Sequence, residues 1–196
     1  MTITLTAVLL AGGESRRMGV DKATLVIDGR PLWLRQLDTL RNLGPDELLI
    51  SARVRPAWAP GDIEVVLDEP PSQGPLSGLT AALRRMRSTQ LLALAIDLPE
   101  MTTGHLSELR QLARPGVGVI PLWGGDSEPL AAIYPATAVS IAESDLATGR
   151  LSLQSLIANL LERQMACIYP ISNDERRFYR NVNSRDDLNQ LISEPG

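Results

Sequence analysis

The chain has 196 residues, a formal net charge of −4 and an ordinary globular composition, with 44% hydrophobic and 21% charged residues. That length fits one compact domain with a substantial core, and the acidic balance disfavours a nucleic-acid partner. No apolar run approaches the about 20 residues that span a membrane, and the first residues lack a basic, signal-like stretch, so we expect a cytoplasmic protein without a membrane partner. One cysteine and one histidine exclude an internal disulfide framework and disfavour a Cys/His zinc site.

Strand-like and helix-like segments alternate in the first part of the chain. An apolar run at 3–10 and a continuously apolar run at 91–96 predict buried strands, and 47–51 and 63–67 are further predicted strands. Helical spacing and capping residues predict a helix from Pro31 to the Gly44-Pro45 pair, a helix at 76–86, and a helix capped by Thr102 or Thr103. This alternation is typical of βαβ units and predicts a parallel sheet.

The alternation ends at Pro115. Residues 117–122 and 129–134 are β-like, and the Gly-rich stretch 123–126 between them predicts a hairpin. Helices at 136–146 and 152–163, a strand at 165–171 and a last helix capped by Ser184 are predicted to follow. We therefore predict a single α/β domain over 1–196, with a doubly wound, mostly parallel sheet flanked by helices and a small antiparallel element in its C-terminal half.

The first predicted strand leads directly into a glycine-rich basic loop. The adjacent Gly12 and Gly13 let backbone N–H groups approach a phosphate, and Arg17 and Lys22 offset its charge. An ordinary strand-to-helix turn with solvated charges is the alternative. The loop matches neither common phosphate motif, because Ala23 follows Lys22 where Walker A needs Ser or Thr, and because the Rossmann pattern needs its first two glycines separated.

Two aspartates, Asp68 and Asp97, each follow an apolar strand. Ligands of doubly wound sheets bind beyond the carboxyl ends of the strands, so both side chains are candidates to face the crevice that holds the loop. A carboxylate there could hold Mg²⁺, which prefers oxygen ligands. The alternative is that each aspartate only caps a turn or a helix.

The loop resembles the signature L-A-G-G-x-S-x-R-M-G-x-x-K of the MobA-like nucleotidyltransferases. Nine positions match: Leu10, Ala11, Gly12, Gly13, Ser15, Arg17, Met18, Gly19 and Lys22. Further matches are Asp97-Leu98-Pro99, Gly74-Pro75-Leu76-Ser77-Gly78 with Asp68 upstream, and Asn181, Asn183, Ser184, Asp187 and Leu188 near the end. The chain departs from many relatives at Ile96, where they have Cys, and at Glu128 before Pro129-Leu130.

The resemblance implies roles for these residues. It implies Arg17, Lys22 and Asp97 as catalytic residues, and Asp97 with Asn183 as ligands of Mg²⁺. It implies a nucleotide site formed by Leu10, Ala11, Gly12, Gly13, Lys22, Asp68, Gly74, Pro75, Leu76 and Asp97. Residues 1–114 would then form a nucleotide-binding half and residues 115–196 an acceptor-binding half.

The activity implied by the resemblance is transfer of GMP from GTP to the terminal phosphate of molybdopterin or the molybdenum cofactor, with release of pyrophosphate. Proteins that hand over or receive the cofactor are then expected partners. Two alternatives within this reaction class are a molybdopterin cytidylyltransferase and a sugar-phosphate nucleotidyltransferase. Cytidylyl relatives tend to carry L-A-A-G and lack G-P-L, so this chain favours guanine. A non-catalytic nucleotide-binding adaptor on the same fold is the alternative from another class.

Four other features have plainer interpretations. We expect His105 to be packed or solvated within its helix, and Cys167 to be a buried packing residue. Trp123, in the predicted glycine-rich turn, is a candidate to stack on a base or a pterin. The arginines at 84, 85 and 87 are expected to form a solvated helix face.

Overall fold

The computed structural model describes residues 3–12, 21–68, 72–182 and 187. Its helices are α1 (Leu32–Arg41), α2 (Pro75–Arg85), α3 (Thr103–Leu112), α4 (Ala138–Ala147) and α5 (Leu153–Glu162), with short 3-10 helices η1 (Lys22–Thr24) and η2 (Arg176–Tyr179). Its strands are β1 (Leu5–Leu10), β2 (Val26–Ile27), β3 (Arg30–Pro31), β4 (Glu47–Ala52), β5 (Glu64–Leu67), β6 (Gln90–Ala95), β7 (Gly118–Trp123), β8 (Asp126–Ser127), β9 (Ala131–Pro135) and β10 (Ala166–Pro170).

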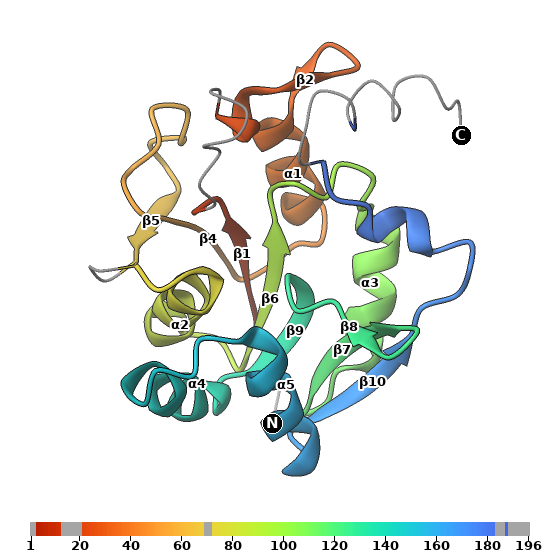
Figure 1. Ribbon diagram of the computed structural model, residues 1–196. Coiled ribbons are helices and arrows are strands. Elements are labelled where there is room, and N and C mark those ends of the chain that lie inside the picture. The colour runs from red at the N-terminus through yellow and green to blue at the C-terminus, as the bar shows by residue number, and fades with distance from the viewer. Residues whose placement is uncertain (1–2, 13–20, 69–71, 183–186, 188–196) are drawn as a thin grey trace.

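The strands form a mixed, mostly parallel sheet in the order β10-β7-β9-β6-β1-β4-β5 (Figure 1). The strands β6, β1, β4 and β5 are mutually parallel, as are β7 and β10. Only β9 runs against its neighbours β6 and β7 along this path. Because β6 and β7 both oppose β9, their carboxyl ends lie on the same edge of the sheet.

The predicted fold class is confirmed, including the antiparallel element of the C-terminal half. Trp123 pairs with Asp126 in the hairpin of β7 and β8, and Gly124 and Gly125 between them have positive φ of 58° and 102°. That backbone conformation is strained for residues with a Cβ, which explains the two glycines. A second hairpin of β2 and β3, turning at Asp28-Gly29, was predicted only as a turn.

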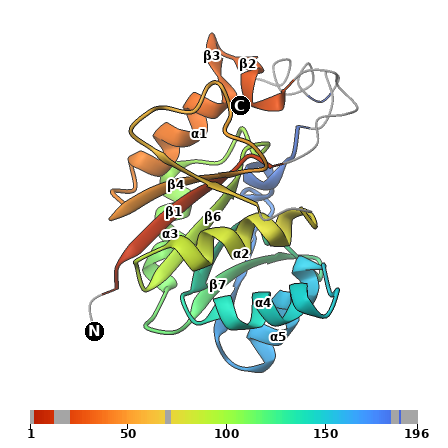
Figure 2. The same cartoon turned by 90° about the vertical axis from the view of Figure 1, so that its left-hand side faces the viewer.

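Alternate strand residues divide the core into two layers. Leu9 and Leu94 pack in one cluster with α1 and α3, whereas Val8 and Ala93 pack in the other with α2, α4 and α5. Figure 2 shows α1 on one side of the strands and α2, α4 and α5 on the other. Strands buried on both faces explain the continuous apolar runs of the sequence.

Helix boundaries follow local capping chemistry. Thr102 caps α3 by accepting the N–H of His105, and Ser152 caps α5 in the same way through Ser155. Pro31 precedes α1 instead of opening it, so that helix begins one residue later than predicted. The predicted cap Ser184 lies outside the described residues, although Asp187 is helical.

Of the three arginines at the end of α2, Arg84 and Arg87 are exposed as predicted and Arg85 is half-buried, and two of them also form ion pairs. Arg84 pairs with Glu143 of α4 across 2.6 Å, and the guanidinium of Arg85 donates twice to Glu64 of β5. The hydrogen bond to Glu64 raises the pKa of Arg85 further. These side chains tie α2 to its neighbours in the fold.

Candidate active site

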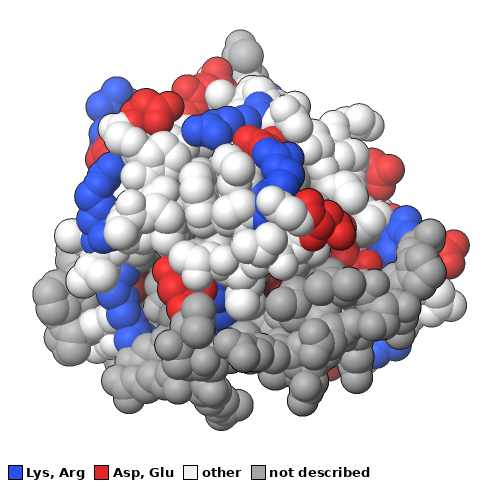
Figure 3. All heavy atoms as spheres, turned by 90° about the horizontal axis from the view of Figure 1, so that it is seen from above, with Lys and Arg blue, Asp and Glu red and all other residues white. Residues whose placement is uncertain are grey.

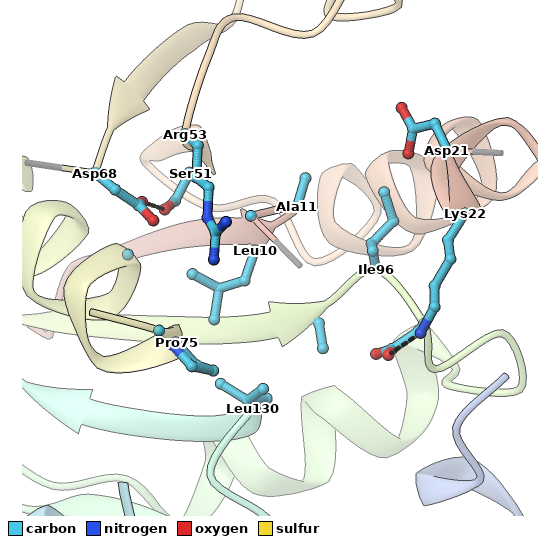
Figure 4. A pocket seen from close by; sticks show the side chains of 15 residues that line it. Leu10, Ala11, Asp21, Lys22, Ser51, Arg53, Asp68, Pro75, Ile96 and Leu130 are labelled. Atoms are coloured by element: carbon cyan, nitrogen blue, oxygen red, sulfur yellow. Dashed lines mark hydrogen bonds and ion pairs between the residues drawn. The ribbon is translucent and has the colours of Figure 1, made fainter. Parts of the chain in front are cut away.

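A cavity of about 330 Å³ opens at the carboxyl ends of β1, β4, β5 and β6. Figure 4 shows Asp68 and Ser51 at one end, Lys22 and Asp21 at the other, and Leu10, Ala11 and Pro75 between them. The complete lining is Leu10, Ala11, Gly12, Asp21, Lys22, Ser51, Arg53, Asp68, Gly74, Pro75, Gly78, Ala95, Ile96, Asp97 and Leu130. The cavity therefore brings together residues at the carboxyl ends of four parallel strands, where doubly wound sheets bind their ligands.

Parallel pairing aligns the ends of the central strands at this cavity. Ala11 continues the β1 ladder by donating its N–H to Ser51 O at 2.8 Å, and Ile96 donates to Leu10 O at 3.1 Å. The main chain at Leu10 and Ala11 is thereby fixed between β4 and the end of β6. The glycine-rich loop begins from this fixed point.

Lys22 and Asp97 meet at one end of the cavity. Lys22 Nζ lies 3.4 Å from Asp97 Oδ2, and the two side chains are only 18% and 23% exposed. Lys22 opens η1, whose cap is the Asp21 carboxylate accepting from Ala23 N at 3.0 Å. Asp21 also accepts from Trp58 Nε1 at 3.0 Å, and Trp58 stacks on Trp33, so the short helix is anchored to α1.

Asp68 is the buried carboxylate at the opposite end of the cavity. Its side chain accepts hydrogen bonds from Ser51 Oγ at 3.2 Å and from Ser72 Oγ at 2.9 Å, and the residue is 7% exposed. Gly78 of α2 passes so close that a Cβ there would lie 2.7 Å from Ser51 Oγ. The glycine therefore lets the helix approach this hydrogen-bonded pair.

The first turn of α2 borders the cavity between these two ends. Gly74 precedes the helix with a φ of 86°, and Pro75 occupies its first position. Helix N-termini carry unpaired N–H groups and a partial positive charge, which suits an anionic ligand. Ser77 Oγ accepts from Gln73 N at 2.9 Å and holds the entering segment against the helix.

Most of the sequence-predicted nucleotide residues line this cavity. Leu10, Ala11, Gly12, Lys22, Asp68, Gly74, Pro75 and Asp97 are among its lining residues. Leu76 is different, because its side chain is fully buried in the core layer beneath α2. Gly13, Arg17 and Asn183 lie outside the described residues.

Among the lining residues that sequence reasoning did not assign to the site, three are polar or charged. Ser51, Arg53 and Asp21 gave no motif of their own, although Ser51 stands at a predicted strand end as Asp68 and Asp97 do. The polar residue closing an otherwise apolar strand was the available signal for Ser51.

A second cavity of about 610 Å³ opens on the same sheet edge beyond β7 and β10. Its lining is Trp123, Asp126, Glu128, Ile171, Asn173, Arg176, Arg177, Tyr179 and Arg180. Arg176 lies over the Trp123 ring, 5.3 Å from its centroid. Burial, and to a lesser degree Asp126, raises the pKa of Glu128. Figure 3, seen from above the view of Figure 1, shows Lys and Arg side chains interspersed with Asp and Glu side chains on the described surface.

The two cavities are neighbours: residues close in sequence line both of them, and a main-chain hydrogen bond links them. Leu130 lines the first and Glu128 the second, two residues apart. Val182 donates its N–H to Asp97 O at 2.9 Å, which fastens the segment after the second cavity to the aspartate of the first. Arg180 extends toward Glu100, with Nε 3.7 Å from Oε2.

This architecture defines a nucleotide-binding α/β protein of the nucleotidyltransferase type, and comparison with known proteins identifies its family. Residues 7–168 match the family model of the MobA-like NTP transferase domain, and the chain belongs to that family. Within the described residues, no helix combines the length and apolarity needed to cross a bilayer.

The chain resembles curated relatives over nearly its whole length. A probable molybdenum cofactor guanylyltransferase of Opitutus terrae is 36% identical over 186 residues, covering 93% of this chain and 92% of the relative. A molybdenum cofactor guanylyltransferase of Cereibacter sphaeroides is 36% identical over 193 residues, covering 94% and 93%.

A solved structure shares the fold. Molybdopterin-guanine dinucleotide biosynthesis protein A from Archaeoglobus fulgidus superposes with a TM-score of 0.74 at 24% identity, covering 96% of this chain and 97% of that one.

Proposed function

We propose that this nucleotidyltransferase moves GMP from GTP to the terminal phosphate of molybdopterin or the molybdenum cofactor and releases pyrophosphate. The observation that carries the proposal is the first cavity. The end of β1, the buried Asp68 carboxylate and the Lys22–Asp97 pair all line this one space. The guanine and the acceptor are supported by the names of relatives 36% identical to this chain.

The nucleotide-binding half, residues 1–114, contributes most of this cavity. We assign the base and ribose to the end lined by Leu10, Ala11, Gly12 and Asp68, where ordered main-chain groups and a buried carboxylate offer specific hydrogen bonds. The triphosphate is assigned to the part of the cavity that runs from the first turn of α2 to Lys22 at the opposite end. Gly13 and Arg17 belong to the same loop and complete the proposed phosphate site. Leu76 supports it only by packing α2 in place.

Asp97 fits the hard-oxygen chemistry of Mg²⁺. Its carboxylate borders the cavity and is partly accessible, so oxygens of a triphosphate and water can complete the coordination. The bond from Val182 N to Asp97 O supports Asn183, the next residue, as a second ligand. When bound, Mg²⁺ would neutralise phosphate charge during transfer.

The reaction needs little proton transfer, because the phosphate of the acceptor is already ionised at neutral pH. The attacking oxygen and the leaving pyrophosphate must be in line at the α-phosphorus, so positioning and charge stabilisation supply the rate. Lys22 and Arg17 stabilise the charge that develops on the phosphate oxygens and on the pyrophosphate. Asp97 holds Lys22 in place through their ion pair and offers the metal its oxygen ligand.

The acceptor-binding half, residues 115–196, contributes the second cavity. Arg176, Arg177 and Arg180 provide cations for a phosphate, and Asp126 and Glu128 provide acceptors for the N–H groups of a pterin. Its adjacency to the first cavity through Glu128 and Leu130 lets an acceptor reach the α-phosphorus. Trp123 is covered on one face by Arg176, so its role in this proposal is to hold that arginine.

A pyrophosphate-release assay with purified protein and Mg²⁺ tests the function. We expect release with GTP only when molybdopterin is present, and little release with CTP or with a sugar phosphate as acceptor. Release with CTP and molybdopterin would instead identify a cytidylyltransferase. Nucleotide binding by calorimetry without release under any pairing would favour the adaptor. We place the reaction in the cytoplasm, where GTP is available, and expect proteins that receive the product there.

A further inference from the structure

A compact group of polar side chains surrounds the single histidine of the chain, apart from the Lys22–Asp97 pair. His105 lies on α3 with its side chain only 2% exposed, among the rings of Tyr169, Phe178 and Tyr179. The Phe178 ring is 4.7 Å from the imidazole, centroid to centroid. The proposed nucleotide site does not use this group, and of its members only Tyr179 also lines the second cavity.

One imidazole nitrogen is satisfied and the other is not. His105 Nε2 lies 2.7 Å from the Tyr179 hydroxyl, a good hydrogen bond. His105 Nδ1 is buried and has no hydrogen-bond partner among the residues that the structure describes. Such an orphaned nitrogen is uncommon in a folded protein and calls for a ligand.

Two carboxylates face that orphaned nitrogen. Glu108 Oε2 and Glu175 Oε1 each lie 3.6 Å from His105 Nδ1, and the three ligand atoms lie within 4.8 Å of one another. A separation of 3.6 Å is long for a hydrogen bond. It is close to the edge of a tetrahedron, because metal bonds of about 2.0–2.1 Å place two donor atoms roughly 3.4 Å apart.

The two carboxylates come from different segments of the chain, and each is held in position locally. Glu108 stands three residues after His105 on the same face of α3, where i,i+3 side chains meet. Glu175 comes from the segment before η2 and is held by Ser172 N, 2.7 Å from its Oε2, and by the Tyr169 hydroxyl. The Glu108 side chain is 59% exposed, so the group has a path to solvent.

We propose that His105 Nδ1, Glu108 and Glu175 bind a divalent transition-metal cation, with Zn²⁺ the best fit to one imidazole nitrogen and two carboxylates. Two carboxylates balance the charge of the cation, and water or the Tyr169 hydroxyl takes the fourth position. Mg²⁺ does not suit this site, because it prefers an all-oxygen shell. The ligand set differs from the Cys/His combination that the composition disfavours.

The neutral state of the imidazole agrees with this assignment. Burial lowers the pKa of His105, although Glu175 and Glu108 act in the opposite direction. The hydrogen bond at Nε2 can hold the ring proton there and leave the Nδ1 lone pair for the metal. A bound cation would tie α3 to the segment that leads into η2, which carries Arg176 and Arg177 of the second cavity.

Zinc titration of tag-free, metal-free protein tests the site. Because the chain has one histidine, nitrogen-labelled histidine gives one imidazole to follow by NMR. We expect zinc sulfate to shift the Nδ1 resonance strongly with one-to-one stoichiometry, and magnesium chloride to leave it unchanged. An unchanged imidazole at saturating zinc, or binding only at millimolar zinc, would overturn the proposal.

Matched variants separate this site from the one at Asp97. Glu108→Gln and Glu175→Gln should each weaken zinc binding by more than about tenfold, since even outer-shell losses cost that much. Glu162→Gln, at an exposed glutamate of α5, and Asp97→Asn should leave the affinity unchanged. If Glu175→Gln disturbs the fold through Tyr169, the exposed Glu108 still gives a clean test. Loss of zinc binding in Asp97→Asn but not in Glu108→Gln would contradict the assignment.

Discussion

Lys22 Nζ and Asp97 Oδ2 lie 3.4 Å apart, although the two residues are 75 positions apart in the chain. Lys22 opens a short 3-10 helix, and Asp97 follows the buried central strand β6. Asp97 lies at the carboxyl edge of the parallel strands, and η1 holds Lys22 over the same edge, so the fold brings this cation and this carboxylate together. The pair joins the proposed phosphate site to the proposed metal ligand.

Replacing Lys22 should therefore slow transfer far more than replacing a cation elsewhere. Lys22→Ala removes a charge-assisted contact to the phosphates and should cost on the order of 2–4 kcal/mol of transition-state stabilisation in kcat/KM. The matched control is Arg84→Ala, whose guanidinium pairs with Glu143 at the surface of α2 and lies outside the cavity. Small and equal losses in both variants would contradict the phosphate assignment.

Asp97→Asn should abolish turnover while preserving the fold. The substitution removes one metal-binding charge, whereas the backbone bond from Val182 N to Asp97 O is unaffected. The measurement is the steady-state rate across a Mg²⁺ titration, together with thermal unfolding. A wild-type rate at limiting Mg²⁺ would show that Asp97 is not a ligand.

Gly78→Ala should damage the Asp68 end of the nucleotide site. The new Cβ would lie 2.7 Å from Ser51 Oγ and 3.1 Å from Asp68 Oδ1, so the bond between these side chains must break or α2 must move. We expect a weaker GTP affinity by calorimetry and a lower melting temperature.

The control for Gly78→Ala is Gly104→Ala. Gly104 is also helical, but its added Cβ has only Thr102 Oγ1 nearby, at 3.9 Å. Alanine is the better helix former, so this variant should be neutral or stabilised by up to about 1 kcal/mol. Equal GTP affinities in the two variants would contradict the close approach at Gly78.

The raised pKa of Glu128 should make the free energy of unfolding depend on pH. Burial, and then Asp126, raises that pKa above its unfolded value of 4.5. As pH rises, Glu128 is deprotonated at a lower pH in the unfolded chain than in the folded protein. The free energy of unfolding therefore falls as pH rises above 4.5, and the folded protein is less stable once the carboxylate is charged. Glu128→Gln should increase the free energy of unfolding at pH about 7, and the gain should vanish near pH 4.

Denaturant titration at the two pH values measures this effect. The carboxylate of Asp126 and the guanidinium groups of Arg176, Arg177 and Arg180 share the cavity with Glu128. A gain that persists undiminished at low pH would mean that the substitution acts through packing and not through charge.

Apolar runs predicted the central strands well, because β1 and β6 are buried on both faces and end where their polar residues begin. Asp68 and Asp97 could be placed at the cavity for the same reason. Hairpins with two-residue strands carry too little periodicity, so β2 and β3 were recognised only by their turn. Cys167 was expected to be fully buried but is only half-buried, because its strand β10 lies at the edge of the sheet.

Contacts between distant segments could not be predicted. Ser51 meets Asp68 only because β4 pairs with β5, and Leu76 faces the core because α2 turns that side toward the sheet. His105 was predicted to be packed or solvated and is packed. Its approach to Glu175 depends on where the segment before η2 lies, which no local pattern indicates.

Transfer of label from GTP to the acceptor tests the central proposal most directly. GTP labelled at its α-phosphate is incubated with molybdopterin, Mg²⁺ and either wild-type protein or Asp97→Asn, and the products are separated and identified by mass. We expect wild type alone to move the label into a guanine dinucleotide of the cofactor, with an equal amount of pyrophosphate released. Label that stays in GTP, or transfer seen only in a parallel reaction with CTP labelled at its α-phosphate, would contradict the proposal.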